Sequence, residues 1–338
     1  MKLFASLALV GAAGVGLGLS ATAATGASHE PGSLLVYPMF DNVRGGFTVI
    51  TVTNTNSDLQ NGSVAVEYRY IDGTSCNEFN RTRNLTPNDT VSVLARNDNP
   101  NMQKGYLYVY AKHKITGKPI KFDHLAGEAM YVAANTGADF FVISPFVYKA
   151  GEALVEGDNT DLENGGVGDG IRDLNGLEYQ TSPDEILIPH FFGQIPGPAA
   201  AQNNLVLINL TGGKTFEAIV DFLVYNDNEE VFSAQHKFKC WDYRPLLEIS
   251  NVFAEAFLDT TNDNPLEEIN TIESGWYKLD GNVAFSTNTS IPDPAILAVQ
   301  VARGLPVGGV FGMGTLPFTL GSQDNGDLLP LTILGDVQ

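Results

Sequence analysis

The residues best suited to bind a metal ion lie in an acidic, glycine-rich stretch, residues 151–185, which holds ten carboxylates against one base, Arg172. Within this stretch, residues 169–176 resemble the aspartate-glycine calcium loops of extracellular proteins. Calcium binds roughly six to eight oxygen atoms, and a loop bent at glycine can turn carboxylates and a carbonyl inward. The candidate calcium ligands are Asp158, Asp161, Glu163, Asp169, Asp173, Asn175 and Glu178.

The acidic stretch departs from a standard calcium loop in its first half. If Gly170 held the sixth position, where such a loop bends, the first and third positions would fall on Gly165 and Val167. Neither residue carries a side-chain oxygen, so carboxylates from either side would have to fold back to complete the site. A solvated acidic linker is therefore the alternative to a calcium site.

The two cysteines, Cys76 and Cys240, are candidates for a disulfide bond. An oxidising compartment pairs cysteines that lie close together in an exported chain. A bond between these two would join the two halves of the chain and fix their orientation. The alternative is a pair of buried thiols, because Cys240 shares one face of an alternating strand pattern with His236 and Phe238.

Four aromatic residues form the candidate ligand-binding set: Trp241, Tyr243, Trp276 and Tyr277. Flat aromatic faces suit stacking on sugar rings, while neighbouring carboxylates and amides can bind the sugar hydroxyls. The alternative for Trp241 is a structural one, in which its ring closes the core at the end of its strand.

No residue is assigned to catalysis. The five histidines are not spaced as zinc ligands, and no glycine-flanked serine elbow, phosphate loop or dinucleotide fingerprint occurs. Carboxylate pairs are common in so acidic a chain, so nothing selects one of them as a glycosidase dyad. A secreted hydrolase is therefore the least favoured hypothesis.

The elements that must position these residues are strands. Residues 63–70 alternate, with Val and Tyr on one face and Glu67 and Arg69 on the other, which predicts a half-buried strand. Short helices are predicted only at 122–135 and 294–303. With 35 Gly and 17 Pro between short apolar runs, the chain is expected to be all-β. Further strands are predicted at 46–55, 90–95, 106–112, 204–209, 218–225 and 231–241.

The two halves of the sequence repeat one another. Residues 35–40 have a counterpart at 187–191, and 66–72 correspond to 221–227, with one cysteine following in each half. This order predicts two tandem immunoglobulin-like β-sandwich domains that arose by duplication. The alternative is that any two β domains share such patterns. The predicted organisation is a signal peptide at 1–23, a first sandwich at 32–150, an acidic linker at 151–185 and a second sandwich at 186–338.

The first residues predict export. Lys2 gives a positive start, residues 3–19 are uncharged and mostly apolar or glycine, and Ala21 and Ala23 supply the small side chains that signal peptidase reads. A Sec-type signal cleaved before Ala24 makes the mature chain secreted or periplasmic. The alternative is a membrane anchor, but the apolar run is shorter than the usual span of about 20 residues, so no integral membrane segment is expected after cleavage.

The net charge of −20, from 19 Lys and Arg against 39 Asp and Glu, argues against nucleic acid as a partner, because phosphate backbones are bound through Lys and Arg. Together these features predict a secreted, non-enzymatic β-sandwich protein with a structural, adhesive or cell-surface-associated role. The expected partner is a cell-surface polysaccharide or protein, and calcium is the only cofactor suggested. The alternative is a carbohydrate-binding module. The strand-and-turn pattern resembles bacterial immunoglobulin-like surface modules, which implies a fold but no function.

Overall fold

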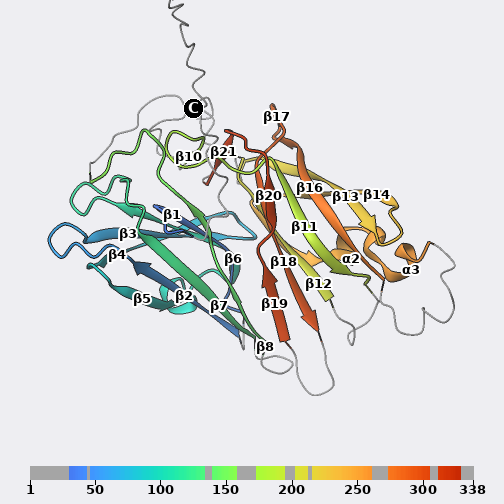
Figure 1. Ribbon diagram of the computed structural model, residues 1–338, viewed down its shortest axis with the longest axis horizontal. Coiled ribbons are helices and arrows are strands. Elements are labelled where there is room, and N and C mark those ends of the chain that lie inside the picture. Colours follow the sequence, from blue (N-terminus) through green and yellow to red (C-terminus); the bar gives the residue numbers. More distant parts are fainter. Residues whose placement is uncertain are drawn as a thin grey trace, which may run out of the picture.

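The computed structural model is nearly all β, with strands gathered in several sheets (Figure 1). It describes residues 30–43, 46–133, 139–157, 173–194, 202–211, 215–260, 273–304 and 311–328. The predicted signal peptide lies outside these residues. The all-β class is therefore confirmed, and the sheets stack in the manner of β-sandwiches.

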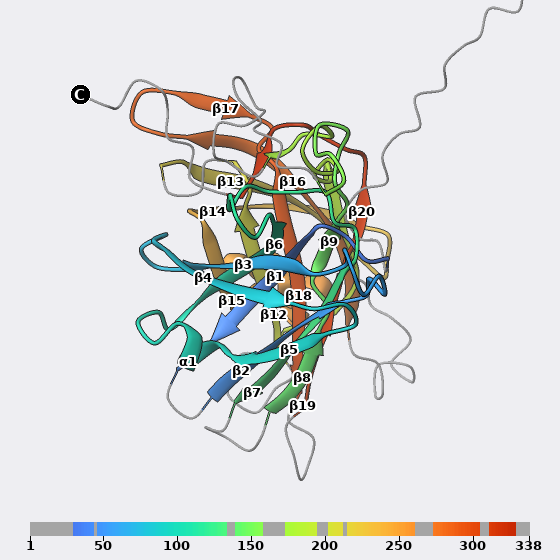
Figure 2. The ribbon, with the colours of Figure 1, turned by 90° about the vertical axis from the view of Figure 1, so that its left-hand side faces the viewer.

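The first half of the chain forms two facing antiparallel sheets, which Figure 2 shows from the first-half side. One sheet has the order β4-β3-β6-β1-β9 and the other β5-β2-β7-β8. A single-turn helix, α1 (Ala95–Asp98), follows β5. The strands are β1 (Leu34–Asp41), β2 (Gly46–Asn54), β3 (Val64–Asp72), β4 (Glu78–Leu85), β5 (Thr90–Leu94), β6 (Lys104–Lys112), β7 (Leu125–Ala133), β8 (Asp139–Ile143) and β9 (Phe146–Tyr148).

The second half also forms two sheets, ordered β14-β13-β16-β11-β20 and β15-β12-β18-β19, with β17 (Ser290–Pro292) added beside β16. Its short helices are α2 (Leu246–Ile249), η1 (Asn251–Phe253) and α3 (Glu255–Leu258). The strands are β11 (Glu185–Phe192), β12 (Gln202–Asn209), β13 (Glu217–Asn226), β14 (Val231–Phe238), β15 (Trp241–Pro245), β16 (Ser274–Phe285), β18 (Ile296–Gly304), β19 (Phe311–Thr315) and β20 (Phe318–Leu320).

The two halves share one strand order. When β1 to β9 are matched in chain order with β11 to β16 followed by β18 to β20, each sheet of the first half has the same strand order as a sheet of the second. Both halves also carry a bulge at a proline: the register of β1 against β6 shifts around Pro38, and that of β11 against β16 shifts around Pro189. A bulge can accommodate proline because no ladder hydrogen bond from the proline nitrogen is needed there.

Strand pairing corrects the sequence alignment of the halves by one residue. Gly105 of β6 pairs with Asp72, and Gly275 of β16 pairs with Asn226, so Asp72 corresponds to Asn226 and not to Asp227. The cysteines are not equivalent either. Cys76 lies in the β3–β4 turn, whereas Cys240 lies between β14 and β15.

The sheet β15-β12-β18-β19 belongs to two hydrophobic cores at once. Along β12, Leu205 and Leu207 face the core of the second half, while Val206 and Ile208 join the core of the first. The same alternation runs along β18, where Val299 joins the first core and Ala298 the second. The two halves are therefore fused through a sheet that is apolar on both faces, and they are not separate domains connected only by a linker.

The disulfide bond between Cys76 and Cys240 is present and locks this junction, as predicted. Beside it, the indole of Trp241 donates a hydrogen bond to the Pro38 carbonyl at 2.9 Å. The ring also covers Gly73, where a Cβ atom would lie 2.3 Å from a Trp241 carbon, so only glycine fits under the indole.

The two predicted helices are wrong. Residues 125–133 form β7 and residues 296–304 form β18, each paired with a strand on both sides. β18 is covered by apolar cores on both faces, which produces a continuous apolar run, and a run of that kind has no period that separates strand from helix. In β7, Ala, Glu and Met favour helix, but pairing to two neighbours overrides that preference.

The described part of the acidic stretch packs against the first half. Residues 173–174 form β10 (Asp173–Leu174), which pairs with β21 (Gly326–Asp327). Leu154, Leu174 and Tyr179 are buried in the first core. This stretch therefore carries ordered, buried side chains on each side of the residues that the structure does not describe.

Candidate functional site

The candidate binding surface is the outward side of the sheet β14-β13-β16-β11-β20, here called the outer face. It is defined by Leu187, Leu223, Tyr225, Val231, Trp276, Phe318 and Leu320. Strand alternation sends the neighbouring side chains, such as Phe222 and Val224, into the core. Strand register then places the outward residues side by side. Leu223 and Leu187 both flank Lys278, and Leu187 also pairs with Phe318.

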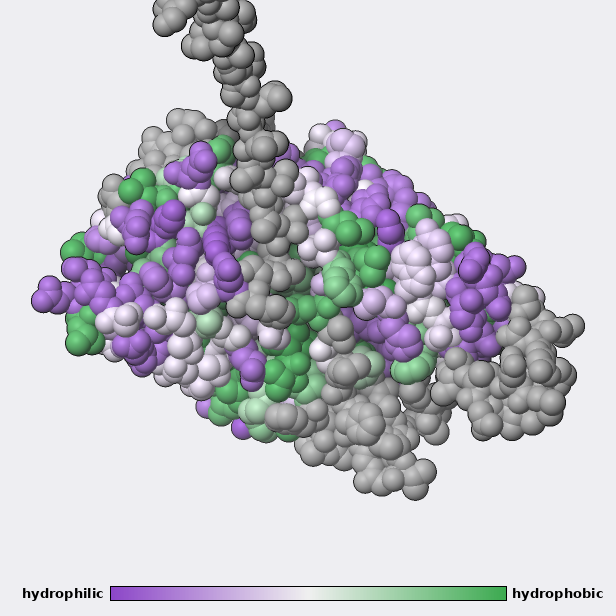
Figure 3. Space-filling view, viewed as in Figure 1, coloured by the Kyte–Doolittle hydropathy of each residue, from purple (hydrophilic) through white to green (hydrophobic). Residues whose placement is uncertain are grey.

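Large apolar side chains on the outer face are exposed to solvent. The exposed fractions are 45% for Leu223, 54% for Val231, 62% for Phe318 and 38% for Leu320. In Figure 3, green side chains gather over β11 among purple ones of the same sheet. Single exposed apolar residues are ordinary, but a group of them on one sheet face is typical of an interaction surface.

An aromatic pair stands in the same row as Val231. Tyr225 and Trp276 pair across β13 and β16, and their rings stack with centroids 4.0 Å apart and planes inclined by 3°. Each ring covers one side of the other, and both residues are partly buried. The pair forms a rigid aromatic base in the outer face, with one ring surface of each residue turned away from the stack.

Polar groups border this apolar surface. Lys278 binds Glu185 at 2.8 Å across β16 and β11. Asp221 accepts hydrogen bonds from the amides of Gln235 and Asn282, each at 2.7 Å. These groups satisfy one another and leave their remaining oxygen lone pairs and amide protons toward solvent.

One carboxyl at the border has a strongly shifted pKa. Partial burial, together with the negative charges of Asp293, Asp184 and Glu185, raises the pKa of Asp280 to about 6. Burial and Asp184 also raise the pKa of Asp293. This end of the outer face therefore gains a proton under mildly acidic conditions.

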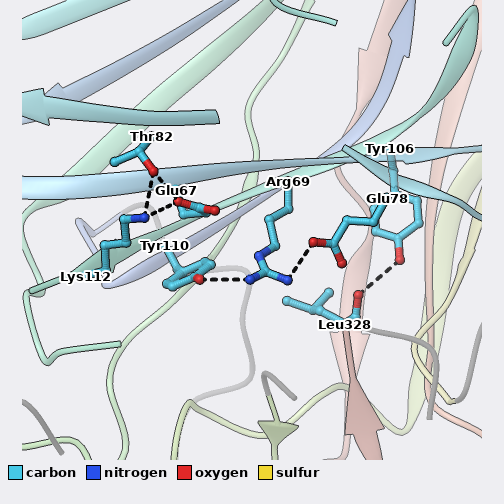
Figure 4. Close-up of polar contacts among 8 residues, drawn as sticks. All are labelled: Glu67, Arg69, Glu78, Thr82, Tyr106, Tyr110, Lys112 and Leu328. Carbon is cyan, nitrogen blue, oxygen red and sulfur yellow. Dashed lines mark hydrogen bonds and ion pairs between the residues drawn. The ribbon is translucent and has the colours of Figure 1, made fainter. Parts of the chain in front are cut away.

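The corresponding face in the first half is covered over β1 and β6, whereas Asn80 and Thr82 of the edge strand β4 are exposed. Its sheet β4-β3-β6-β1-β9 packs against the second half and against residues 326–328. Figure 4 shows the polar contacts on this face: Lys112 and Thr82 bind Glu67, Arg69 binds Glu78 and Tyr110, and Tyr106 donates to the Leu328 carbonyl. Burial alone would raise the pKa of Glu67, but the hydrogen bonds from Lys112 and Thr82 hold it below its usual value.

A pocket of about 190 Å³ opens at the mouth of the second sandwich, between β11, β12 and β18. Gln300 crosses it, donating to the His190 carbonyl at 2.8 Å and accepting from the Tyr277 hydroxyl at 3.0 Å. His190 and Phe192 form its rim, with ring centroids 4.4 Å apart and perpendicular planes. The pocket is lined by Ile188, Pro189, His190, Phe192, Asn203, Gln300 and Ala302.

The structure separates the four aromatic residues predicted to bind a ligand. Trp241 is buried at the junction and Tyr277 is fully buried in the second core. Tyr243 packs against the first core, with the Lys104 ammonium 5.6 Å from its ring centre. Only Trp276 reaches an open surface, and its partner there is Tyr225, which the sequence pattern did not single out.

The predicted calcium ligands fall into two groups. Asp158, Asp161, Glu163 and Asp169 lie outside the described residues. The side chain of Asn175 accepts hydrogen bonds from the amides of Leu177 and Glu178, and the Glu178 carboxylate accepts one from the Asp173 amide at 2.9 Å. Asn175 and Glu178 thus shape a turn. Within the described ranges, no three His, Cys, Asp or Glu side chains converge as a metal site.

His236 of β14 belongs to a charged cluster with residues of β15. Its Nε2 atom is 2.6 Å from Asp242, which also binds Arg244 at 2.5 and 3.0 Å. Burial alone would raise the pKa of Asp242, but these hydrogen bonds hold it below its usual value. The cluster ties β14 to β15 at the edge of the second sandwich.

Comparisons with known proteins show no family for this chain. The sequence matches no known protein family, and no curated protein matches it. A solved structure titled "Crystal Structure of Thermotoga maritima 1070" aligns with 35% of this chain and 95% of its own, at 8% identity and a TM-score of 0.27. Such a score is too low to show a shared fold. Among the described residues, no helix has the length and apolar character to cross a membrane.

Proposed function

We propose that the chain is a secreted or periplasmic β-sandwich protein with an adhesive role at the cell surface, and that the outer face is its contact surface. The observation that carries this proposal is the difference between equivalent sheets. The outward side of β1 and β6 in the first half is covered by the second half, with only the edge strand β4 exposed, whereas that of β14-β13-β16-β11-β20 exposes Leu223, Val231 and Phe318. Apolar groups of this kind lose unfavourable contact with water when a partner covers them.

The partner that fits the outer face best is a protein surface of apolar side chains. Four of the seven residues that define the outer face are aliphatic, and in the first half β1 and β6 of the equivalent sheet are covered by a β-sheet of the second half. The salt bridge between Lys278 and Glu185 supplies polar groups at the centre of the face. A central apolar patch with a few satisfied polar groups is typical of protein interfaces.

Export is supported by the disulfide bond. Cys76 and Cys240 are bonded, and disulfides persist in oxidising compartments outside the cytoplasm. The signal peptide proposed at 1–23 would deliver the chain there. N-terminal sequencing of the protein recovered from the periplasm or medium should begin at Ala24, and recovery of the intact N-terminus in the cytoplasm would contradict export.

We further infer that the halves are tandem immunoglobulin-like sandwiches. In immunoglobulin domains strand B pairs with E in one sheet and C pairs with F in the other. The pairs β2–β5 and β3–β6 follow that pattern, as do β12–β15 and β13–β16. The variation is that β1 lies beside β6, where an immunoglobulin domain has its last strand, G.

Polysaccharide binding at Trp276 is the second candidate function. The stacked pair of Trp276 and Tyr225 provides an aromatic base, and the amides of Gln235 and Asn282 lie on the same face. Aromatic rings flanked by amides and carboxylates suit a sugar. Calcium binding by the acidic stretch remains a separate prediction, tested by thermal melts of the whole chain with calcium and with chelator.

Cell binding tests the proposal. Purified, fluorescently labelled chain is titrated onto intact cells of its source, and the bound fraction is measured by flow cytometry. Saturable binding is expected, with at least a tenfold loss for the double variant Leu223→Ser/Phe318→Ser. The matched control is Leu59→Ser/Ile115→Ser, which removes two apolar side chains of 80% and 90% exposure from the first half.

Pretreatment of the cells separates the two candidate partners. Loss of binding after protease treatment supports a protein partner, whereas loss only in the presence of soluble cell-surface polysaccharide supports the sugar alternative. Absence of saturable binding, or an equal loss for both double variants, would overturn the adhesive role of the outer face.

A further inference from the structure

The pocket at the mouth of the second sandwich has a filled counterpart in the first. Strand register identifies it: Ala302 of β18 pairs with Asn203 of β12, and in the first half Tyr131 of β7 pairs with Thr48 of β2. Asn203 and Thr48 occupy the same place, since each binds the carbonyl of the residue that ends the bulged strand, Phe192 or Asp41. Tyr131 therefore stands where the second half has Ala302.

The ring of Tyr131 closes the first mouth. Tyr131 is buried, and its ring stacks on Phe141 with centroids 4.8 Å apart. Its hydroxyl donates a hydrogen bond to the Met39 carbonyl at 2.7 Å. Met39 follows the proline of the bulge, so this carbonyl lies at the shift in register and accepts a hydrogen bond from a phenol.

The second mouth keeps the acceptor but lacks the ring. His190 follows Pro189 as Met39 follows Pro38, and its carbonyl accepts a hydrogen bond from the Gln300 amide. A carbonyl oxygen has two lone pairs, so a second donor can be bound there. The space left by the small Ala302 side chain is part of the pocket of about 190 Å³.

We propose that this mouth binds a single phenol ring, held as Tyr131 is held in the first half. The size is suitable, because an apolar cavity of about 150 Å³ is enough to bind benzene. Ile188, Pro189 and Ala302 provide apolar walls, and Phe192 meets the ring at the rim. The phenol hydroxyl donates to the His190 carbonyl, as the Tyr131 hydroxyl donates to Met39.

The test is a titration of the whole disulfide-bonded chain with p-cresol, followed by NMR shifts of isotope-labelled alanine and isoleucine methyl groups. Saturable shifts at Ala302 and Ile188 are expected. The variant Ala302→Tyr supplies the ring that the first half already has, so at least a tenfold loss of p-cresol affinity is expected, read from the Ile188 methyl. The control is Leu223→Ser on the outer face, which should bind p-cresol as the native chain does.

Two further ligands define what the mouth recognises. Toluene has the same shape without the hydroxyl and should bind at least threefold more weakly. The peptide acetyl-Gly-Tyr-Gly-amide presents the same ring on a chain: tighter binding of this peptide than of p-cresol identifies a tyrosine side chain of a partner as the ligand, and weaker binding identifies a free phenol.

Failure of p-cresol to shift the Ile188 methyl, unchanged affinity in Ala302→Tyr, or equal affinity for toluene would overturn the proposal. The variant Tyr131→Ala gives a second check, because it opens the first mouth. If that variant folds, as judged by its circular dichroism, it should bind two p-cresol molecules instead of one. This proposal is independent of the outer face, since Leu223→Ser tests only that surface.

Discussion

The two sandwiches are built on one strand order, but equivalent surfaces are covered in the first and open to solvent in the second. In the first, the outward side of β1 and β6 is covered and the mouth is filled by Tyr131. In the second, the corresponding face exposes Phe318 and Leu223, and the mouth is open beside Ala302. This contrast supports the two proposals: a partner surface is expected on the open face and an aromatic ring in the open mouth.

The largest effect is expected from breaking the link between the halves. The double variant Cys76→Ser/Cys240→Ser removes a bond across a sequence separation of 164 residues. A loop of that size gives a loss of about 5 kcal/mol in unfolding free energy in the chain-entropy model. Denaturant unfolding measured with and without reductant should show this loss in the native chain and no effect of reductant in the variant.

The two tryptophans give a matched pair of tests for covered and open faces. Trp241→Ala removes a buried ring and its hydrogen bond to Pro38, so a loss of about 3–5 kcal/mol is expected. Trp276→Ala removes a partly exposed ring and should cost less than about 1.5 kcal/mol. Equal losses in urea unfolding would contradict the assignment of one face as interior and the other as open.

The border of the outer face should respond to pH through Asp280. Its pKa in the folded chain, about 6, is raised above the ordinary value of 3.8, so the folded state holds the proton more tightly than the unfolded chain. Stability should therefore fall as pH rises from about 4 to 6, and the cost persists above pH 6. Asp280→Asn should be more stable than the native chain by about 1 kcal/mol at pH 7, since solvent screens this partly exposed group.

That difference should disappear near pH 4, where Asp280 is protonated in the folded native chain. Thermal melts of both proteins at pH 4 and pH 7 measure it. A gap that is the same at both pH values would show that the substitution acts by packing and not through the charge of its neighbours.

The smallest effect on stability is expected on the outer face itself. Phe318→Ser alters a side chain that is 62% exposed and at the sheet edge, so the unfolding free energy should change by no more than about 0.5 kcal/mol. Cell binding by the same variant should nevertheless decrease. A large loss of stability would instead identify Phe318 as part of the core.

The strands and the disulfide could be predicted from sequence because they depend on local information. Alternation along residues 63–70 and a pair of cysteines behind a predicted signal peptide are visible without a structure. The helix prediction at 294–303 failed because β18 is buried on both faces, and its period is then hidden. Nothing in the composition shows that a sheet of one half will be shared with the core of the other.

The sites were harder to predict because they depend on register. A one-residue error in aligning the halves exchanges inward for outward side chains in a strand of period two. Only the strand pairing shows that Ala302 in the second half is equivalent to Tyr131 in the first, and this equivalence identifies the open mouth. Trp241 and Trp276 look alike in sequence, but their burial depends on which sheet lies over each strand.

The doubly apolar sheet has a consequence for how such a protein can evolve. A repeat that is a self-contained unit can be copied, lost or exchanged by recombination at its linker, as the modules of many surface proteins are. Here a cut in 151–185 would leave Val206, Ile208 and Val299 facing water on one fragment and strip the cover from the other. Fusion through a common sheet therefore ties the two halves together: neither can be lost without exposing the core of the other.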